Sequence, residues 1–373
     1  MINKSIAKEN DNHEAVGLLM TYSCNFDCKY CYIKKKRNVG MSFSMAQRIL
    51  EPLLNKNHGL LDITFVGGET LLAVDVIKQL VEWVECGNWK KQYRFFGSTN
   101  GSLLDEDLKR WIEPRKDVFT LALSYDGIPS VQELNRGNLP IDIDYFIKTW
   151  PKQPIQMTIN SNAVNDMAKG VIYLLEKGGT VHPNVAFEEY EWNPADVIEY
   201  GKQLDMLADY YDKHENLPVI TQFQHNILAY AKCITEHQPQ PQVCGAGHGY
   251  EVYDVDGVVY PCHMLSPLVI EEDRLKPIRR GLVQGTTDFS DSRCADCPYT
   301  SNCPTCIGCN FIYRDSLQQR DLTHCRIMRT EVRSYIKKEL KRLKNKTNLT
   351  SEDATAIDAI KMIYEYESTH PIF

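Results

Sequence analysis

Residues 16–35, VGLLMTYSCNFDCKYCYIKK, join an apolar run to three closely spaced cysteines. The run VGLLMTY is typical of a buried β-strand, and Cys24, Cys28 and Cys31 follow it directly. Three thiols are too few for a closed tetrahedral zinc site, and they are an odd number for disulfide pairing. The spacing C-x3-C-x2-C can instead hold three irons of a cubic iron–sulfur cluster. The fourth iron then stays open, which is typical of a reactive metal site.

The sequence around this motif alternates between β-rich runs and helical patterns. We expect strands at residues 16–22, 62–69, 93–101, 119–127, 155–161 and 184–190. Apolar residues at helical spacing predict helices between them, over residues 44–54, 74–84, 167–177 and 194–213. The first helix is predicted to begin with a capping box made by Ser44 and Gln47. This alternation predicts parallel βαβ units, which either close partly into a barrel or form an open sheet.

Unusual stretches follow four of the expected strands. The cysteines follow the first strand, GGET (67–70) follows the second, TNG (99–101) ends the third, and SYDG (124–127) ends the fourth. In both barrels and open α/β sheets, ligands bind at the carboxyl ends of the strands. We therefore expect all four stretches to meet at one end of the sheet.

Bulk composition excludes several classes of protein. No apolar run approaches 18 residues, so we expect no transmembrane helix. The polar N-terminus lacks the apolar region of a signal peptide, which predicts a cytoplasmic protein. The net charge of −7 argues against nucleic acid as the main partner. In a reducing compartment, clustered cysteines indicate metal ligation rather than disulfides, and eleven of the 13 cysteines fall into two groups.

A polar, Pro- and Gly-rich stretch near residue 236 predicts a domain boundary. We expect an N-terminal tail (1–14), a core domain (15–235), a cysteine-rich domain (236–326) and a helical extension (327–373). The cysteine-rich part has few long apolar runs, so it is predicted to need metal to fold. The extension is interpreted as an exposed basic helix followed by a second helix, packed as a pair or, alternatively, docking a partner.

The motif CNFDCKYC (24–31) resembles the cluster-binding loop of radical S-adenosylmethionine (SAM) enzymes. In that family, the amino and carboxylate groups of SAM chelate the open iron of a [4Fe-4S] cluster. One electron splits SAM into methionine and a 5′-deoxyadenosyl radical, which takes a hydrogen atom from the substrate. The resemblance spans residues 15 to about 215 and implies a partial (β/α)6 TIM-like barrel.

The stretch GGET resembles the glycine-rich loop that contacts the methionine amino group in this family. Gly67, Gly68 and Glu69 would supply it, and Thr70 stands where the family more often has proline. Glycine permits a close approach of the backbone. The alternative for Glu69 is a helix-entry carboxylate, which the helix dipole favours.

Other polar and aromatic residues match the family's cofactor contacts. Tyr30 stands where the family places an aromatic ring against the adenine, and Asn100 is expected to border the SAM pocket. Ser124 and Arg136 resemble the polar contacts to the ribose and the carboxylate, because an arginine fork binds two carboxylate oxygens. The alternative for Arg136 is an ordinary arginine in a surface loop.

The second cysteine group resembles the SPASM extension, which carries two auxiliary four-iron clusters. The stretch YDVDGVVYPCH (253–263) resembles its hairpin, with a turn at Asp256-Gly257. The resemblance implies an outer cluster held by Cys294, Cys297, Cys303 and Cys325, and an inner one held by Cys244, Cys262, Cys306 and Cys309.

The spacing after Cys303 departs from the family pattern. The family has a cysteine after three intervening residues, whereas here Cys306 follows after two and Cys309 after five. Either is the equivalent ligand, or one of the two donates a hydrogen atom, as an epimerase would need. A pair of zinc ribbons is the alternative for the whole segment.

Two further sites are candidates for catalysis. His263 follows Cys262 where sulfatase-maturing members have an aspartate base; it would act as a base or hydrogen-bond a cluster. The difference puts sulfatase maturation in doubt. Glu189, with Glu188 and Glu191, is expected at the mouth of the barrel facing a substrate; the alternative is a solvated acidic loop.

These features predict a radical SAM enzyme with three [4Fe-4S] clusters that modifies a peptide or protein by crosslinking, oxidation or epimerisation. A ribosomally made peptide is the expected substrate, and flavodoxin or ferredoxin the expected electron donor. Because only about 14 residues precede the first strand, any leader recognition is expected to use the C-terminal helices or the barrel mouth. The alternatives are a small-molecule dehydrogenase or epimerase and a non-catalytic zinc-ribbon module.

Overall fold

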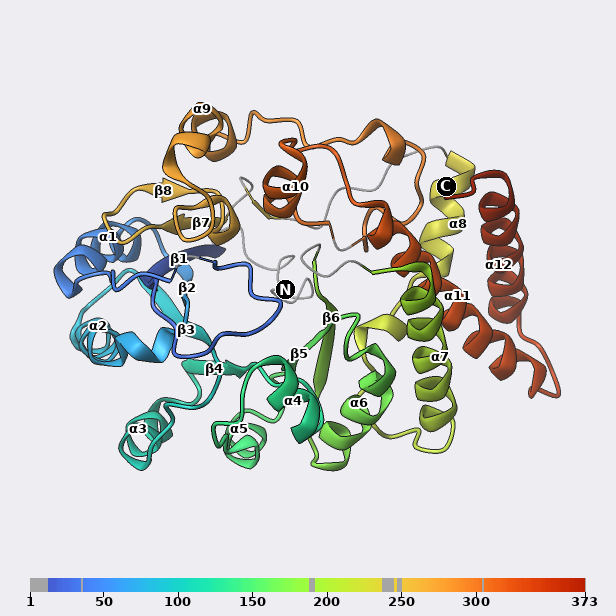
Figure 1. Cartoon of the computed structure of the whole chain (residues 1–373), viewed down its shortest axis with the longest axis horizontal. Coiled ribbons are helices and arrows are strands. Elements are labelled where there is room, and N and C mark those ends of the chain that lie inside the picture. The colour runs from blue at the N-terminus through green and yellow to red at the C-terminus, as the bar shows by residue number, and fades with distance from the viewer. Residues whose placement is uncertain are drawn as a thin grey trace.

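The computed structural model describes residues 13–34, 36–187, 192–236, 245–246, 250–303 and 305–372. Parallel strands follow one another in chain order, with helices on their outer side (Figure 1). They are β1 (His13–Thr21), β2 (Gly59–Gly67), β3 (Lys91–Thr99), β4 (Phe119–Leu123), β5 (Ile155–Ile159) and β6 (Val181–Val185). A single parallel bridge between Ser124 and Gln156 links β4 to β5. The arc of strands confirms the expected partial barrel.

The helices of this part come between the strands. They are α1 (Phe43–Asn55), α2 (Val74–Cys86), α3 (Glu106–Ile112), α4 (Pro129–Asn135), α5 (Ile143–Thr149), α6 (Met167–Glu176) and α7 (Pro194–Tyr211). The predicted capping box at Ser44 is wrong. Ser42 caps α1 instead, because it lies in extended backbone and its Oγ accepts from the Met45 nitrogen at 3.2 Å.

Aromatic and aliphatic side chains from the strands and the surrounding helices form the main hydrophobic core. Phe65 and Phe95 stack with their ring centres 5.9 Å apart, and Phe119 lies 6.3 Å from each. All three rings are almost fully buried, and burying such a side chain contributes about 1.5–3 kcal/mol. This core holds the strand ends in fixed positions.

The cysteine-rich segment begins as an extension of the same sheet. The predicted hairpin is present as β7 (Tyr250–Tyr253) and β8 (Val259–Tyr260), and Gly257 takes the turn with φ at +84°. Strand β7 also pairs in parallel with β1, from Ala15 to Leu18. Because β7 is hydrogen-bonded to β1, the cysteine-rich segment is fixed against the first strand of the barrel.

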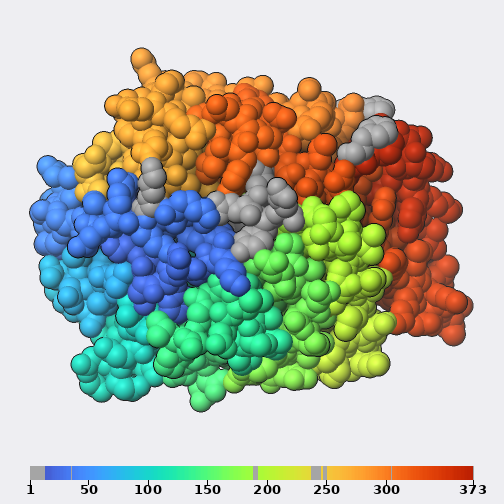
Figure 2. Space-filling model, in the orientation of Figure 1, coloured from blue at the N-terminus to red at the C-terminus, as the bar shows by residue number. Residues whose placement is uncertain are grey.

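The remaining helices are α8 (Ile227–Glu236), α9 (Glu272–Val283), α10 (Ile307–Arg314), α11 (Leu322–Lys344) and α12 (Ser351–Thr369). In Figure 1, α12 lies beside α8 at the edge of the molecule, and α11 runs past α7. Figure 2 shows the cysteine-rich segment, in gold and orange, as a layer along one side of the barrel. None of the helices in the described part of the chain is long and apolar enough to cross a lipid bilayer.

The interpretation of α11 as an exposed basic helix is wrong for one of its faces. Ile327, Val332 and Ile336 are completely buried. On its other side, Lys337 pairs with Asp205 of α7 at 2.7 Å. The apolar positions of α11 therefore fasten it to the barrel, while its lysines pair with acidic residues of α7.

A half-buried glutamate, Glu331, lies between α7 and α11. The hydroxyl of Tyr200 donates to Glu331 at 2.7 Å, and burial raises the pKa of Glu331 to about 7. Because the folded-state pKa is raised, this group's stabilisation is present below about pH 4.5 and is lost as the pH rises through about 7. At neutral pH and above, the charge on Glu331 opposes folding.

We expect Glu331→Gln to stabilise the protein at pH 8 by up to about 3 kcal/mol, since one pKa unit corresponds to about 1.4 kcal/mol. The difference in the free energy of unfolding between the variant and the wild type should grow by about 1 kcal/mol between pH 6 and pH 8. Denaturant unfolding of the protein at both pH values measures this difference in the free energy of unfolding. Glu365→Gln, at an exposed position of α12, is the control and should show no such trend. If Glu331→Gln stabilises the protein equally at pH 6 and pH 8, the raised pKa of Glu331 is contradicted.

Candidate functional site

The loop that carries the first cysteines is held against the end of β2 by backbone hydrogen bonds. The Gly68 nitrogen donates to the Thr21 carbonyl at 3.0 Å, and the Glu69 nitrogen donates to the Ser23 carbonyl at 2.9 Å. A Cβ atom on Gly68 would lie 2.2 Å from the Ser23 oxygen, and one on Gly67 would lie 2.4 Å from the Thr21 oxygen. The two glycines therefore let GGET contact the start of the cysteine loop.

Glu69 connects the ends of β2 and β3. Its side chain is almost fully buried, and its carboxylate accepts from the Leu71 nitrogen at 3.0 Å, the Thr99 hydroxyl at 2.7 Å and the Asn100 nitrogen at 2.7 Å. Burial raises the pKa of Glu69, and these three hydrogen bonds counter the shift. The bond to Leu71 caps a short helix, η1 (Thr70–Ala73), as the helix-entry alternative predicts. The other two bonds brace the strand ends.

Asn100 joins the end of β3 to the cysteine loop. Its Nδ2 donates to Asn25 Oδ1 at 2.9 Å, and its Oδ1 accepts from the Ser102 nitrogen at 3.0 Å. Asn25 lies between Cys24 and Cys28. Three of the four unusual stretches are thus connected, as the convergence of strand ends predicts.

The fourth stretch contributes a buried carboxylate that the sequence analysis did not single out. Asp126, in SYDG, is completely buried. It accepts from the Tyr30 hydroxyl at 2.5 Å and pairs with Arg136 at 3.0 Å. The Arg136 guanidinium also lies 5.2 Å from the centre of the Tyr30 ring. Tyr30 and Arg136, which are far apart in the sequence, are brought together by Asp126.

Arg136 is not a surface residue, because its side chain is only 8% exposed. It follows α4, and its buried Nε has no hydrogen-bond partner within the described ranges. Burial raises the pKa of the Cys28 thiol to about 11, and the positive charge of Arg136 counters the shift. The guanidinium therefore lies within electrostatic range of the cysteine loop and keeps one donor for an anion. Ser124, half-buried, lies where β4 meets β5.

In the second cysteine group, Cys294, Cys297, Cys303 and Cys325 lie within electrostatic range of one another. Burial raises the pKa of each thiol, to about 11 for Cys294 and about 12 for Cys303, and thiols of the same set raise the pKa of Cys294, Cys303 and Cys325 further. Buried thiols with raised pKa values ionise when a metal ligates them. The structure thus assembles the residues expected to hold the outer cluster.

Members of the inner set lie close to the first cysteine loop. Burial raises the pKa of the Tyr32 hydroxyl, and the thiols of Cys31, Cys306, Cys309 and Cys262 raise it further. Cys306 caps α10 and Cys309 lies in its first turn. Cys244, expected in the same set, lies outside the described residues. Tyr32 therefore lies within electrostatic range of both Cys31 in the first loop and the described members of the inner set.

Of the two catalytic candidates, the structure describes His263 but not Glu189. The ring of His263 lies 5.8 Å from that of Tyr32, and burial lowers the pKa of His263 to about 4. A neutral imidazole at pH 7 can accept a proton or a hydrogen bond, although a low pKa makes it a weak base. Glu189, with Glu188 and Glu191, lies outside the described residues.

Residues 18–149 match the family model described as the Radical SAM superfamily. An uncharacterized protein of Methanocaldococcus jannaschii is 31% identical over 118 residues, or 32% of this chain and 40% of that protein. The radical SAM cyclopropyl synthase TigE of Paramaledivibacter caminithermalis is 19% identical over 87% of this chain and 74% of its own. The chain spans less than two thirds of the length of the M. jannaschii protein and of an Archaeoglobus fulgidus relative.

Solved structures share the fold over most of the chain. The structure of anSMEcpe with bound AdoMet (SAM) has a TM-score of 0.62 and 20% identity, covering 89% of this chain and 98% of that one. SuiB of Streptococcus suis, bound to the precursor peptide SuiA, has a TM-score of 0.57 and 18% identity, covering 82% and 74%. Residues 18–149 therefore resemble the Radical SAM superfamily in sequence, and most of the chain shares the fold of these two solved structures.

Proposed function

We propose that the chain is a SAM-dependent radical enzyme that modifies a peptide or protein side chain. The observation that carries the proposal is the meeting of the cysteine loop with the buried group of Tyr30, Asp126 and Arg136. Two relatives by fold support the substrate class. The neighbour anSMEcpe was solved with AdoMet and the Cp18Cys peptide, and SuiB with its precursor peptide.

Cys24, Cys28 and Cys31 would hold the SAM-binding [4Fe-4S] cluster, which when bound supplies the electron that splits SAM. The chain's own residues would orient the cofactor. Arg136 offers its unpartnered Nε, a donor suited to the SAM carboxylate. Asp126 fixes the Tyr30 ring and the Arg136 guanidinium in place. These two side chains would therefore need little reorientation when SAM binds.

The remaining cofactor contacts are proposed from the same end of the barrel. Asn100 would border the pocket beside the cysteine loop, and Ser124 would face the ribose. Gly67 and Gly68 would allow the cysteine loop to contact the end of β2. Glu69 would stabilise the strand ends rather than bind SAM, because its carboxylate oxygens already accept hydrogen bonds from Leu71, Thr99 and Asn100.

Two auxiliary [4Fe-4S] clusters would occupy the second cysteine group, and when bound they supply a place for the electron that substrate oxidation releases. Cys294, Cys297, Cys303 and Cys325 would hold the outer one; Cys244, Cys262, Cys306 and Cys309 the inner one. Among the described residues, no three Cys, His, Asp or Glu side chains lie close enough to share a single metal ion.

The proposal places two catalytic candidates on the substrate side. His263, beside Tyr32, would accept a proton or fix a cluster ligand, and Glu189 would meet the substrate at the mouth. A flavodoxin or ferredoxin would supply the reducing electron, because SAM cleavage needs a one-electron donor.

Anaerobically reconstituted and reduced enzyme should convert SAM to 5′-deoxyadenosine, which chromatography with mass detection measures. Cys28→Ala should abolish the product, because it removes one of the three thiols of the open-site motif. Cys86→Ala, at an exposed lone cysteine, is the matched control and should keep the wild-type rate. Product from the Cys28 variant at the wild-type rate would contradict the proposed site.

Gly68→Ala should displace the cysteine loop, because its methyl group would meet the Ser23 carbonyl. We expect loss of the SAM-binding cluster, about a third of the bound iron if three clusters are present, together with loss of SAM cleavage. Gly201→Ala in α7 is the control, because its tightest new contact is a Thr330 methyl carbon at 3.1 Å. A Gly68 variant with full iron content and activity would refute this packing argument.

The peptide substrate is tested by co-expressing the enzyme with short peptides encoded beside its gene and measuring their mass. A loss of hydrogen or a new crosslink that depends on Cys28 is expected. If no such peptide changes, while 5′-deoxyadenosine formation is stimulated by a small metabolite, the substrate is not a peptide.

A further inference from the structure

Arg320, just before α11, is buried and forms no ion pair with another described residue. It is 5% exposed, and its Nε has no hydrogen-bond partner in the part of the chain that the structure describes. Its backbone is fixed on both sides, since its nitrogen donates to Asp291 at 2.9 Å and its carbonyl accepts from Arg293 at 2.8 Å. Burying an unpaired guanidinium costs several kcal/mol, so the site is arranged for an anion.

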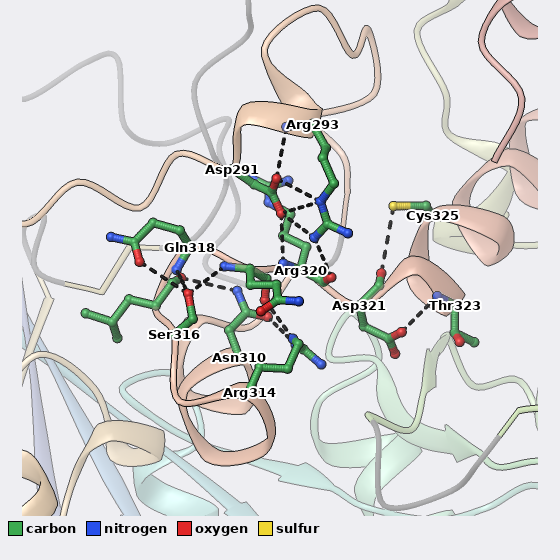
Figure 3. A network of polar contacts seen from close by, with 12 residues as sticks. Asp291, Arg293, Asn310, Arg314, Ser316, Gln318, Arg320, Asp321, Thr323 and Cys325 are labelled. Carbon is green, nitrogen blue, oxygen red and sulfur yellow. Dashed lines mark hydrogen bonds and ion pairs between the residues drawn. The ribbon is translucent and has the colours of Figure 1, made fainter. Parts of the chain in front are cut away.

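The nearby acidic and amide groups are already engaged. Asp291 forms a two-pronged pair with Arg293, with contacts of 2.5–3.1 Å. Asp321 caps α11 by accepting from the Thr323 nitrogen at 2.8 Å. Figure 3 shows Arg320 between the Asp291–Arg293 pair and Asn310, and the sulfur atom of Cys325 in contact with the Asp321 carbonyl oxygen. No carboxylate in the described ranges forms an ion pair with Arg320.

A small cavity opens beside this guanidinium. Cys303, Cys306 and Cys325 line it together with Arg320 and His324. His324 is also 5% exposed, and its Nδ1 has no partner within the described ranges. Two buried polar side chains with unused nitrogen atoms thus line the same cavity as three thiols.

The positive charge of Arg320 acts on all four thiols that are expected to hold the outer cluster. Burial raises the pKa of Cys294, Cys297, Cys303 and Cys325, and Arg320 counters the shift at every one of them. Arg293 also acts on Cys325, but it pairs with Asp291. Arg329 acts on Cys297 and Cys325 and is half-buried. Asp321 lines the same cavity as Arg320, but no ion pair joins the two among the described residues. Arg320 is therefore the most deeply buried of the three arginines that act on this cysteine set.

We propose that Arg320 is a positioning residue for the outer auxiliary cluster and raises its reduction potential. This inference rests on the clusters of the proposed function. A cubic cluster gains one electron on reduction and so becomes more negative by one charge. A fixed buried cation stabilises that reduced form more than the oxidised one. The electron that substrate oxidation releases is then drawn toward the outer set.

The test is an anaerobic redox titration of the holoenzyme followed by electron paramagnetic resonance. Arg320→Gln should move the midpoint potential of one cluster to more negative values and leave the other clusters in place. Arg320→Lys, which keeps the charge, should restore part of the shift. Arg110→Gln, an exposed arginine on α3, removes the same charge elsewhere and should leave all potentials unchanged. A Gln variant with full iron content and wild-type potentials overturns the proposal.

The iron content of the variants, which measures loss of the outer cluster, also tests the proposal. If Arg320→Gln loses about four irons per chain and Arg320→Lys retains them, the charge stabilises the cluster as proposed. If both variants lose the iron, Arg320 is needed for local folding, and the proposal is overturned. Wild-type enzyme that cleaves SAM but binds only about four irons lacks the outer cluster, which overturns this inference and leaves the SAM chemistry intact. Failure of SAM cleavage with a normal potential shift concerns the proposed function alone.

Discussion

The structure of the site depends on the close backbone contact between Gly67–Gly68 and Thr21–Ser23. This contact places the cysteine loop on the end of β2, and the Glu69 carboxylate then ties β2 to β3 through two further hydrogen bonds. A side chain on Gly68 has no space, because the Ser23 oxygen occupies it. The loop that carries the three thiols is therefore positioned by the strand ends, where the SAM-binding cluster is proposed to lie.

Buried positive charge accompanies both cysteine groups. Arg136 lies near the first and Arg320 near the second, and each keeps a buried Nε without a partner in the described ranges. The two differ because Arg136 pairs with Asp126, whereas Arg320 forms no ion pair with another described residue. In the proposed SAM site, the Asp126 pair would orient the arginine. In the proposed outer cluster site, the charge of Arg320 would stabilise the anionic cluster.

The sequence was sufficient to predict the six strands and the meeting of their ends, because periodicity and turn residues are local signals. It did not reveal Asp126, whose role depends on Tyr30 and Arg136 packing around it. The pairing of β7 with β1 was also missed, since a four-residue strand gives no sign of a partner over 230 residues away. The buried face of α11 was hidden by its many lysines and arginines, of which Lys337 and Lys341 pair with α7 and Arg333 pairs with Glu367 of α12.

The most direct test of the account is the electron paramagnetic resonance spectrum of the reduced N-terminal cluster, with and without SAM, in a variant whose auxiliary cysteines are replaced. If one iron of that cluster lacks a protein ligand, added SAM should change the g-values of the cluster, and SAM with magnetic isotopes in its amino and carboxylate groups should broaden the cluster signal. A spectrum that is identical in the presence and absence of SAM would contradict the central claim.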